Sequence, residues 1–344
     1  MSKILKKQVS VYWTILMAAV TGGSCFLLAG LHITGLHINN SETDPKTSIA
    51  STTYCSYKLT RLGGFNYVNP LLYAEKTCEE EHLIPLKSAL NGMIANYKSS
   101  GVINHASIYV RKFVDGTWIS INGENTYSPG SLLKIPTMMT FFKMNEKDPG
   151  LLDRKIGFLK PFDSDRNVHF TSNAIQLGKY YSYRELIKYM IVHSDNNATK
   201  LLNMHMDMKM FSDIFTELGL RKPDLTAKEY RISALDASVF LKVLYNAVYL
   251  NTTDSEYCTS LLAQSDFKEG MVSGLPSECK VAHKFGEGGP DNKPDFSETG
   301  IIYGTKGNYL ITVMANGNNL KDMPTIVSEI SRTSYQFLES EDTN

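Results

Sequence analysis

Apolar residues follow a helical period in some segments of this chain and alternate with polar residues in others. Residues 82–101 have the period of an amphipathic helix and stop at a glycine. Residues 105–113 and 116–122 alternate on either side of Asp115-Gly116, a dipeptide that is typical of a tight β-hairpin turn. The pattern therefore predicts a helix followed by a two-stranded hairpin.

The middle of the chain is predicted to be helical, and its last part returns to strands. Further helical periods cover residues 131–144, 184–193, 197–206 and 234–250. Strand patterns follow at residues 280–286, 298–304 and 308–317, with a last helix at 323–338. We therefore predict an α/β protein of the α+β sandwich type, in which an antiparallel five-stranded sheet with flanking helices is interrupted in sequence by a helical subdomain.

The N-terminal part of the chain has a different pattern. A run without charged residues follows three lysines and is long enough, at about 1.5 Å per residue, to cross a hydrocarbon core about 30 Å thick. By the positive-inside rule, the lysines place the N-terminus in the cytoplasm and the bulk of the chain outside. A cleaved signal peptide is the alternative, although no clear A-x-A site follows. We expect a cytoplasmic tail at 1–8, a transmembrane helix at 9–34, a polar stalk at 35–67 and a folded domain at 68–344.

Composition and charge narrow the class of protein. The 344 residues include 35 bases, 35 acids and 42% hydrophobic residues, which is enough to bury a sizeable core. Because residues 1–39 carry three lysines and no acid, the rest of the chain carries 32 bases against 35 acids. This balance argues against a nucleic-acid partner, and we expect a monomer.

Four cysteines follow the predicted membrane segment, which itself contains Cys25. An even number in an oxidising compartment permits two disulfides with three possible connectivities. Proximity in the sequence favours Cys55 with Cys78 and Cys258 with Cys279. No spacing is typical of a zinc site, and we expect neither a metal nor a cofactor.

Three short motifs occur in a specific order and context. They are Ser131-Leu132-Leu133-Lys134 at the start of a helix, Ser194-Asp195-Asn196 between two helices, and Lys284-Phe285-Gly286 on a strand. An S-x-x-K sequence alone is weak evidence, because it recurs at Ser265 and Ser277. Only Ser131 is followed by an apolar helix, a Ser-Asp-Asn sequence 63 residues on and a strand-borne Lys-x-Gly 90 residues beyond that.

Together the motifs resemble those of the penicillin-recognising serine hydrolases, the superfamily of class A β-lactamases and D-alanyl-D-alanine peptidases, and specifically its class A branch. The resemblance spans about residues 68–340. It implies that Ser194 passes a proton toward the leaving group, that Asn196 orients the substrate amide and that Lys284 maintains the electrostatics of the pocket. Gly286 would line the substrate site, and the backbone N–H groups of Ser131 and Glu287 would bind the oxyanion.

The chemistry explains why these residue types belong together. A serine hydroxyl is a poor nucleophile at neutral pH, so it needs a nearby base and donors for the oxyanion that it creates. Lys134 follows Ser131 by one helical turn and projects on the same face. A lysine that is desolvated and close to other cations has a lowered pKa and can accept the serine proton.

Each motif also has a purely structural interpretation. Ser131 could cap its helix, Ser194 and Asp195 could cap the next one, and Lys284 could be an exposed strand lysine. His193 and His283, which flank two of the motifs, are expected to pack or to hydrogen-bond locally rather than to act as bases.

Three departures from the family pattern bear on activity. The chain lacks the E-x-x-L-N sequence whose glutamate activates water in class A enzymes, and residues 219–233 are similar to a shortened version of that loop. Glu229 is the nearest candidate for the water base and Asp224 the second; both could instead be solvated acids in a basic loop. Phe285, which we assign to the substrate-binding site, stands where the family usually has a hydroxyl, and Thr299 stands near the usual place of an arginine, so recognition of an anionic β-lactam is weakened.

We therefore expect a membrane-anchored, extracytoplasmic serine hydrolase that forms an ester on Ser131. Its substrate would be an amide, either a β-lactam or a cell-wall peptide, with slow turnover of β-lactams. Two alternatives remain open: a D,D-peptidase acting on peptidoglycan, and a catalytically silent module of the same fold that binds cell-wall peptide or a protein.

Overall fold

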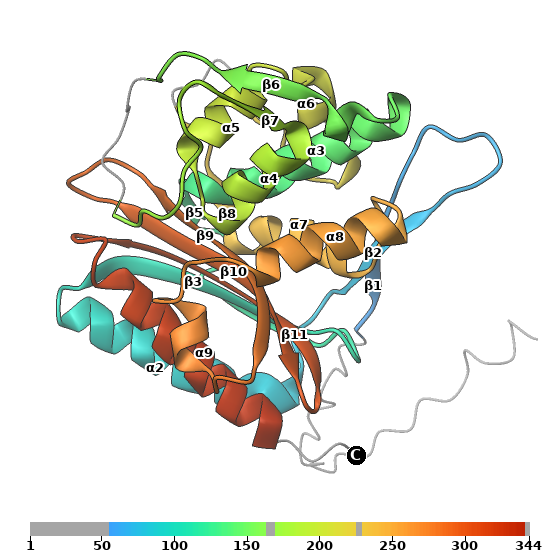
Figure 1. Cartoon of the computed structure of the whole chain (residues 1–344). Helices are drawn as coiled ribbons and strands as arrows, with labels where there is room; N and C mark the ends of the chain where they lie inside the picture. The colour runs from blue at the N-terminus through green and yellow to red at the C-terminus, as the bar shows by residue number, and fades with distance from the viewer. Residues whose placement is uncertain (1–54, 163–168, 225–228, 341–344) are drawn as a thin grey trace, which may run out of the picture. The chain divides into compact units, whose positions relative to one another are not determined.

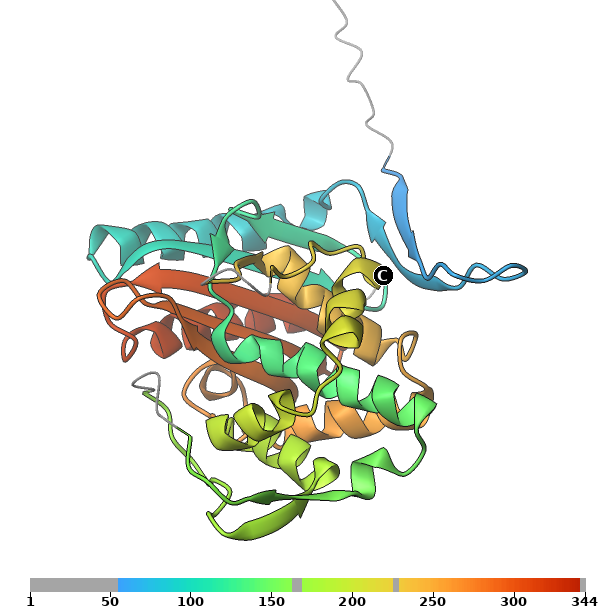
Figure 2. The same cartoon turned by 90° about the horizontal axis from the view of Figure 1, so that it is seen from above.

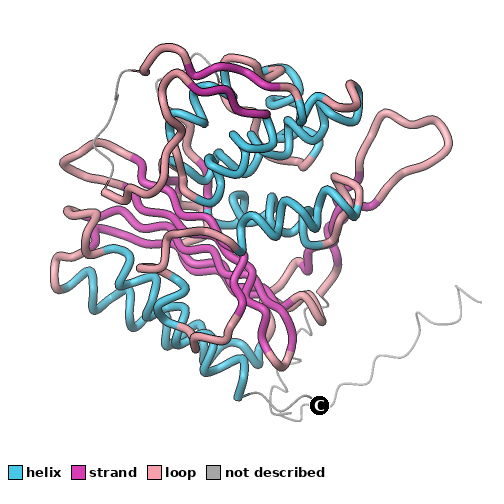
Figure 3. Tube along the Cα trace, viewed as in Figure 1, coloured by secondary structure: helices cyan, strands magenta, loops and turns pink. Residues whose placement is uncertain are grey.

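The computed structural model describes residues 55–162, 169–224 and 229–340. Its central element is a five-stranded antiparallel sheet. The strand order is β4-β3-β11-β10-β9, so β9 lies at one edge (Figure 3). The strands are β3 (Ile103–Lys112), β4 (Trp118–Ile121), β9 (Lys280–Gly288), β10 (Asp295–Gly304) and β11 (Gly307–Gly317). The predicted five-stranded sheet, with its two halves separated in sequence by helices, is confirmed.

Helices cover both faces of this sheet (Figure 1). On one face lie α2 (Ile84–Ser99) and α9 (Met323–Ser340). On the other face lie the helices α3 (Lys134–Lys147), α4 (Tyr183–Val192), α5 (Asn196–Asn203), α6 (Met208–Glu217), α7 (Ala234–Tyr245) and α8 (Thr252–Ala263). Short 3-10 helices occur at Glu81–Leu83, Gly130–Leu133, Leu151–Asp153 and Met271–Gly274.

The central sheet divides the hydrophobic core into two clusters, as the alternating side chains of β11 show. Leu310 and Met314 belong to the cluster on the side of α3 to α8, whereas Ile311 and Val313 belong to the cluster that packs against α2 and α9. This is the result expected when successive side chains of a strand point to opposite faces. Both clusters are apolar, so the sheet is buried on both sides.

Among the described residues, three small two-stranded sheets lie outside the central one, and the sequence pattern did not predict them. They are β1 (Tyr57–Arg61) with β2 (Leu71–Lys76), β5 (Thr126–Tyr127) with β8 (Ile232–Ser233), and β6 (Lys155–Phe158) with β7 (Lys179–Ser182). Each strand is short, and the polar residues of β1 made it indistinguishable from the expected stalk.

The predicted domain boundary at residue 68 is wrong, because it falls inside the β1–β2 hairpin. This hairpin is fixed to the body by the carboxylate of Glu75, which lies 2.8 Å from the Lys242 ammonium and 2.9 Å from the Arg111 guanidinium. The hydroxyl of Tyr73 also donates a hydrogen bond to the carbonyl of Leu218. The folded part therefore includes the residues from Cys55 onward.

The cysteines follow the sequence prediction in one pair only. Cys55 and Cys78 form a disulfide, with their Cα atoms 5.6 Å apart, as predicted. Cys258 and Cys279 are both free thiols, so their predicted bridge is wrong. The reason is that Cys258 is buried in the cluster of α3 to α8, whereas Cys279 packs against the cluster of α2 and α9.

The predicted membrane segment, residues 9–34, lies outside the described residues, as do the predicted tail and most of the stalk. Within the described ranges, every helix is too short or too polar to cross a bilayer.

Candidate active site

Ser131 lies in the 3-10 helix Gly130–Leu133, immediately before α3. Its side chain is half-buried. Leu133, and not Ser131, occupies the N-cap position of α3, and no side chain caps this helix. The capping interpretation of Ser131 is therefore excluded.

Two glycines allow strand β9 to approach the turn that carries Ser131. A Cβ atom on Gly286 would lie 2.2 Å from the carbonyl oxygen of Pro129 and 2.9 Å from the backbone nitrogen of Ser131. A Cβ on Gly130, whose φ is +51°, would lie 2.1 Å from the carbonyl oxygen of Glu287. Only glycine fits such close backbone contacts. The backbones of Ser131 and Glu287 thus meet at one junction on the edge of the sheet, the arrangement that a pair of oxyanion donors needs.

Lys134 connects α3 to the Ser-Asp-Asn turn. Its Nζ lies 2.6 Å from the carbonyl oxygen of Ser194, 3.1 Å from the Ser194 hydroxyl oxygen and 2.8 Å from Oδ1 of Asn196. From the opposite side, Nζ of Lys284 donates to the same Ser194 hydroxyl at 2.9 Å and to the carbonyl of Phe285 at 3.0 Å. The structure therefore brings the three sequence motifs together, with the Ser194 hydroxyl shared by two lysines.

Burial controls the protonation of both lysines. Desolvation lowers the pKa of Lys134 from 10.5 to about 7, even though the negative charges of Asp195 and Glu287 raise it. Burial, and then the positive charge of Lys134, lower the pKa of Lys284 well below its usual value. A lysine with a pKa near 7 is partly neutral at physiological pH and can accept a proton from a hydroxyl. Lys134 thus has the property required of the base for Ser131.

Asp195 holds the turn that presents Ser194. Its buried carboxylate accepts hydrogen bonds from the backbone N–H of Asn197 at 2.8 Å, which caps α5, and from the N–H of Ile175 at 2.9 Å. Ser194 has a φ of +54°, a left-handed conformation that a non-glycine residue adopts only when its surroundings enforce it. The capping interpretation is thus correct for Asp195. The Ser194 hydroxyl instead accepts hydrogen bonds from Lys134 and Lys284.

The side chain of Glu287 is a feature that sequence reasoning missed, since only its backbone N–H had been assigned. Its carboxylate is buried and accepts the backbone N–H groups of His169 at 2.9 Å and of Phe170 at 3.2 Å. It also raises the pKa values of Lys134 and Lys284. In the sequence, the only indication of this role was an acidic residue directly after the Lys-x-Gly motif.

Phe285 and Thr299 have no donor to offer a substrate carboxylate. The Phe285 ring is buried and stacks on Phe267 at 4.1 Å between ring centroids, with Phe170 edge-on at 5.1 Å. The hydroxyl of Thr299 is buried and hydrogen-bonded to that of Thr312 at 2.7 Å. The side chain of Phe285, which had been assigned to substrate binding, instead packs in an aromatic cluster.

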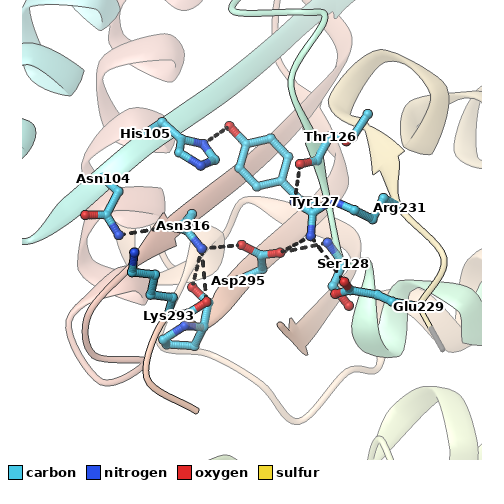
Figure 4. A network of polar contacts seen from close by, with 11 residues as sticks. Asn104, His105, Thr126, Tyr127, Ser128, Glu229, Arg231, Lys293, Asp295 and Asn316 are labelled. Carbon is cyan, nitrogen blue, oxygen red and sulfur yellow. Dashed lines mark hydrogen bonds and ion pairs between the residues drawn. The ribbon is translucent and has the colours of Figure 1, made fainter. Parts of the chain in front are cut away.

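Glu229, the predicted water base, is exposed and forms an ion pair with Arg231 at 3.5 Å (Figure 4). Asp195 and Glu287, rather than Glu229, are the carboxylates that act on Lys134. The structure therefore does not bring Glu229 to the lysines, and it matches the interpretation of a solvated acid in a basic loop. Asp224, the second candidate, is also exposed.

Asp295 is another positioning residue that the sequence did not reveal. Its buried carboxylate accepts the backbone N–H of Ser128 at 2.8 Å and the side-chain amide of Asn316 at 2.7 Å (Figure 4). Arg231 lies 3.6 Å from the same carboxylate. These contacts hold Ser128, three residues before Ser131, against the start of strand β10.

The two histidines beside the motifs bond locally, as predicted. Nδ1 of His193 lies 2.6 Å from Oδ2 of Asp266, and Nδ1 of His283 lies 2.7 Å from Oε1 of Glu298. Across the part of the chain that the structure describes, no three His, Cys, Asp or Glu side chains are grouped so that they could hold a metal ion.

Residues 85–338 match the Beta-lactamase2 family, which is described as a beta-lactamase enzyme family. The chain belongs to this family. Its match extends from α2 to α9 and includes all three motifs, so the penicillin-recognising serine hydrolase fold inferred from the motifs is confirmed.

Solved structures of β-lactamases and related proteins share the fold of this β-lactamase family member. PBP-A is 17% identical with a TM-score of 0.64, over 77% of this chain and 99% of its own. A beta-lactamase from Chitinophaga pinensis DSM 2588 is 20% identical with a TM-score of 0.63, over 73% of this chain and 98% of its own. One from Sphaerobacter thermophilus DSM 20745 is 18% identical with a TM-score of 0.62, over 73% and 96%. A comparison with curated protein sequences gave no significant match.

Proposed function

We propose that this chain is an extracytoplasmic serine hydrolase that forms an acyl ester on Ser131 with an amide substrate, either a β-lactam or a cell-wall peptide. The observation that carries the proposal is the Ser194 hydroxyl, which lies within hydrogen-bond distance of both Lys134 and Lys284. The location outside the cytoplasm is supported by the Cys55–Cys78 disulfide, since disulfides persist in oxidising compartments, and by the charge-free run after the N-terminal lysines.

The first step begins with the transfer of the Ser131 hydroxyl proton to neutral Lys134. The Ser131 oxygen attacks the amide carbonyl carbon, and the backbone N–H groups of Ser131 and Glu287 bind the resulting oxyanion. The proton then passes from Lys134 through the Ser194 hydroxyl, which can accept from one lysine while it donates elsewhere, to the amide nitrogen. The C–N bond breaks and the Ser131 ester remains; the amine of a peptide departs, whereas that of a β-lactam stays attached to the opened ring.

The second step, hydrolysis of the ester, is expected to be slow. It needs a water molecule with a base within hydrogen-bond reach, but the E-x-x-L-N sequence is absent and Glu229 is paired with Arg231. Acylation by β-lactams should also be slow, because Phe285 and Thr299 present no donor for their carboxylate and Glu287 adds a negative charge. Each 1.4 kcal/mol added to a barrier lowers the rate about tenfold.

The absence of the E-x-x-L-N sequence also makes a D,D-peptidase the second candidate. An enzyme without an efficient water base would accumulate its acyl ester on a β-lactam, so that the drug acts as an inhibitor rather than as a substrate. One solved structure similar to this chain is a point mutant of PBP-A as an acyl-enzyme complex with penicillin G. The third possibility, a silent binding module, requires that Ser131 react with neither class of compound.

Time-resolved intact-mass measurement of the full chain tests this proposal. We expect penicillin G to add its mass once, slowly, and the adduct to persist. Release of D-alanine from a D-alanyl-D-alanine peptide would favour the D,D-peptidase. An unmodified parent protein with every β-lactam tested would overturn the enzyme assignment in favour of the binding module, and cephalosporin hydrolysis at about ten or more turnovers per second would contradict slow release. Ser265→Ala is a matched control, because Ser265 has the same S-x-x-K spacing but is buried elsewhere.

A further inference from the structure

The β1–β2 hairpin presents an apolar outer face. Its inner face is fixed to the body through Glu75 and Tyr73. In the register of the two strands, the outer face carries Tyr57, Leu59 and Leu71, which are 55%, 50% and 44% exposed. The hairpin extends away from the other elements in both views (Figures 1 and 2).

The loop at the end of this hairpin continues the apolar face. Phe65, Tyr67 and Val68 are 53%, 98% and 61% exposed. The base of the loop is closed by a hydrogen bond from the backbone N–H of Leu62 to the carbonyl of Pro70, and the Arg61 guanidinium donates to the carbonyl of Asn69. These hydrogen bonds hold the loop in a defined conformation with its aromatic side chains exposed to solvent. The exposed side chains therefore contribute little hydrophobic stabilisation to the fold.

Bases outnumber acids in the hairpin. Residues 57–76 contain Lys58, Arg61 and Lys76 against one acid, Glu75, which is paired with the body, although the chain from residue 40 onward has more acids than bases. Exposed aromatic residues flanked by bases are the composition that favours the headgroup region of a bilayer, where the rings meet the acyl boundary and the bases attract anionic lipid.

We propose that the β1–β2 hairpin contacts the membrane, with Phe65, Tyr67 and Val68 inserted at the headgroup level of an anionic bilayer and with the exposed Arg61, which shares the outer face, next to the lipid phosphates. The predicted membrane segment ends at residue 34, and the 20 residues between it and Cys55 span at most about 70 Å. A domain anchored through this segment would therefore stay within reach of the same bilayer, which raises the effective concentration of the hairpin at the lipid surface. The contact would hold the domain in one orientation above the membrane.

Tryptophan quenching in vesicles tests the proposal with the full chain. Tyr67→Trp places a fluorophore at the tip, and Tyr180→Trp is the matched control, since Tyr180 is 62% exposed on β7 of another small two-stranded sheet. Both variants keep the native Trp13 and Trp118 as a common background. The vesicles contain phosphatidylcholine alone or with phosphatidylglycerol, with and without brominated phosphatidylcholine.

We expect brominated lipid to reduce the emission of Tyr67→Trp more than that of Tyr180→Trp, with a shift to shorter wavelength and a larger effect when phosphatidylglycerol is present. Equal quenching of the two variants in both lipids would overturn the proposal. A blue shift that grows with protein concentration but is insensitive to brominated lipid would also overturn it, in favour of a second copy of the chain. Neither readout involves acylation of Ser131, so failure here is distinct from failure of the proposed hydrolase activity.

Discussion

Nζ of Lys134 lies 2.6 Å from the carbonyl oxygen of Ser194 and 3.1 Å from its hydroxyl oxygen. Through this contact a buried lysine of α3 is joined to the turn that precedes α5. When Lys134 is neutral, the Ser194 hydroxyl can donate to its lone pair, and when Lys134 is charged, the same hydroxyl accepts from it. The pair can therefore move a proton without any rearrangement of the backbone.

The pH dependence of acylation should report the protonation of Lys134. Because burial lowers its pKa to about 7 and the base must be neutral, the acylation rate should rise with pH through 7 and level off above it. Below the pKa, the neutral fraction falls about tenfold per pH unit. The measurement is the second-order acylation rate with penicillin G between pH 5.5 and 8.5. A rate that is independent of pH over this range would contradict the role of Lys134.

Glu287→Gln should shift this pH profile toward lower pH. The carboxylate favours the charged form of Lys134, so its replacement by a neutral amide lowers the pKa of the lysine further. The variant keeps one acceptor for the N–H groups of His169 and Phe170. Glu229→Gln serves as the control, since it removes an exposed acid and should leave the profile in place. A profile that stays in place in Glu287→Gln, or that moves to higher pH, would show that this charge does not raise the pKa of Lys134.

Glu229→Gln should also leave the lifetime of the acyl ester unchanged. Glu229 is exposed and paired with Arg231, and surface substitutions of this kind change free energies by about 0.5 kcal/mol or less, which corresponds to about twofold in a rate. The measurement is the decay of the penicillin adduct by intact mass. If the substitution made the adduct markedly longer-lived, Glu229 would be the water base and the chain a β-lactamase with a rearranged loop.

The sheet and the three motifs were predictable because their signals are local. The Asp115-Gly116 turn and the alternation along residues 308–317 identify strands without reference to the rest of the chain. The motifs of Ser131, Ser194 and Lys284 were linked by their order and context, which resemble those of the penicillin-recognising serine hydrolases. The strands depend on side-chain periodicity, whereas the joining of the motifs depends on that resemblance.

The supporting contacts were not predictable, because they join residues far apart in the sequence. The contacts of Glu287 with His169 and of Asp295 with Ser128 depend on how β9 and β10 meet the loops of the helical part. The mistaken pairing of Cys258 with Cys279 has the same origin, since proximity in sequence gives no information about the packing layers that separate them.

The cysteines provide a separate test of the fold. We expect non-reducing peptide mapping to find the Cys55–Cys78 bridge, and Cys279 to react with a thiol reagent in the native state. Cys258 should react only after unfolding, because it is buried and burial raises the pKa of its thiol. Replacement of both Cys55 and Cys78 by serine should lower the free energy of unfolding by about 2 to 4 kcal/mol. A Cys258–Cys279 bridge in the native protein would contradict the packing described above.

The most direct test of the whole account is to locate the acyl group by peptide mapping after incubation of the full chain with penicillin G. We expect the added mass on the peptide that contains Ser131, and its loss in Ser131→Ala and in Lys134→Ala. The double variant should lose little more than either single one, because members of one catalytic unit are not additive. An adduct on Ser265 or Ser277, or an adduct that persists in Ser131→Ala, would contradict the assignment of Ser131 as the nucleophile.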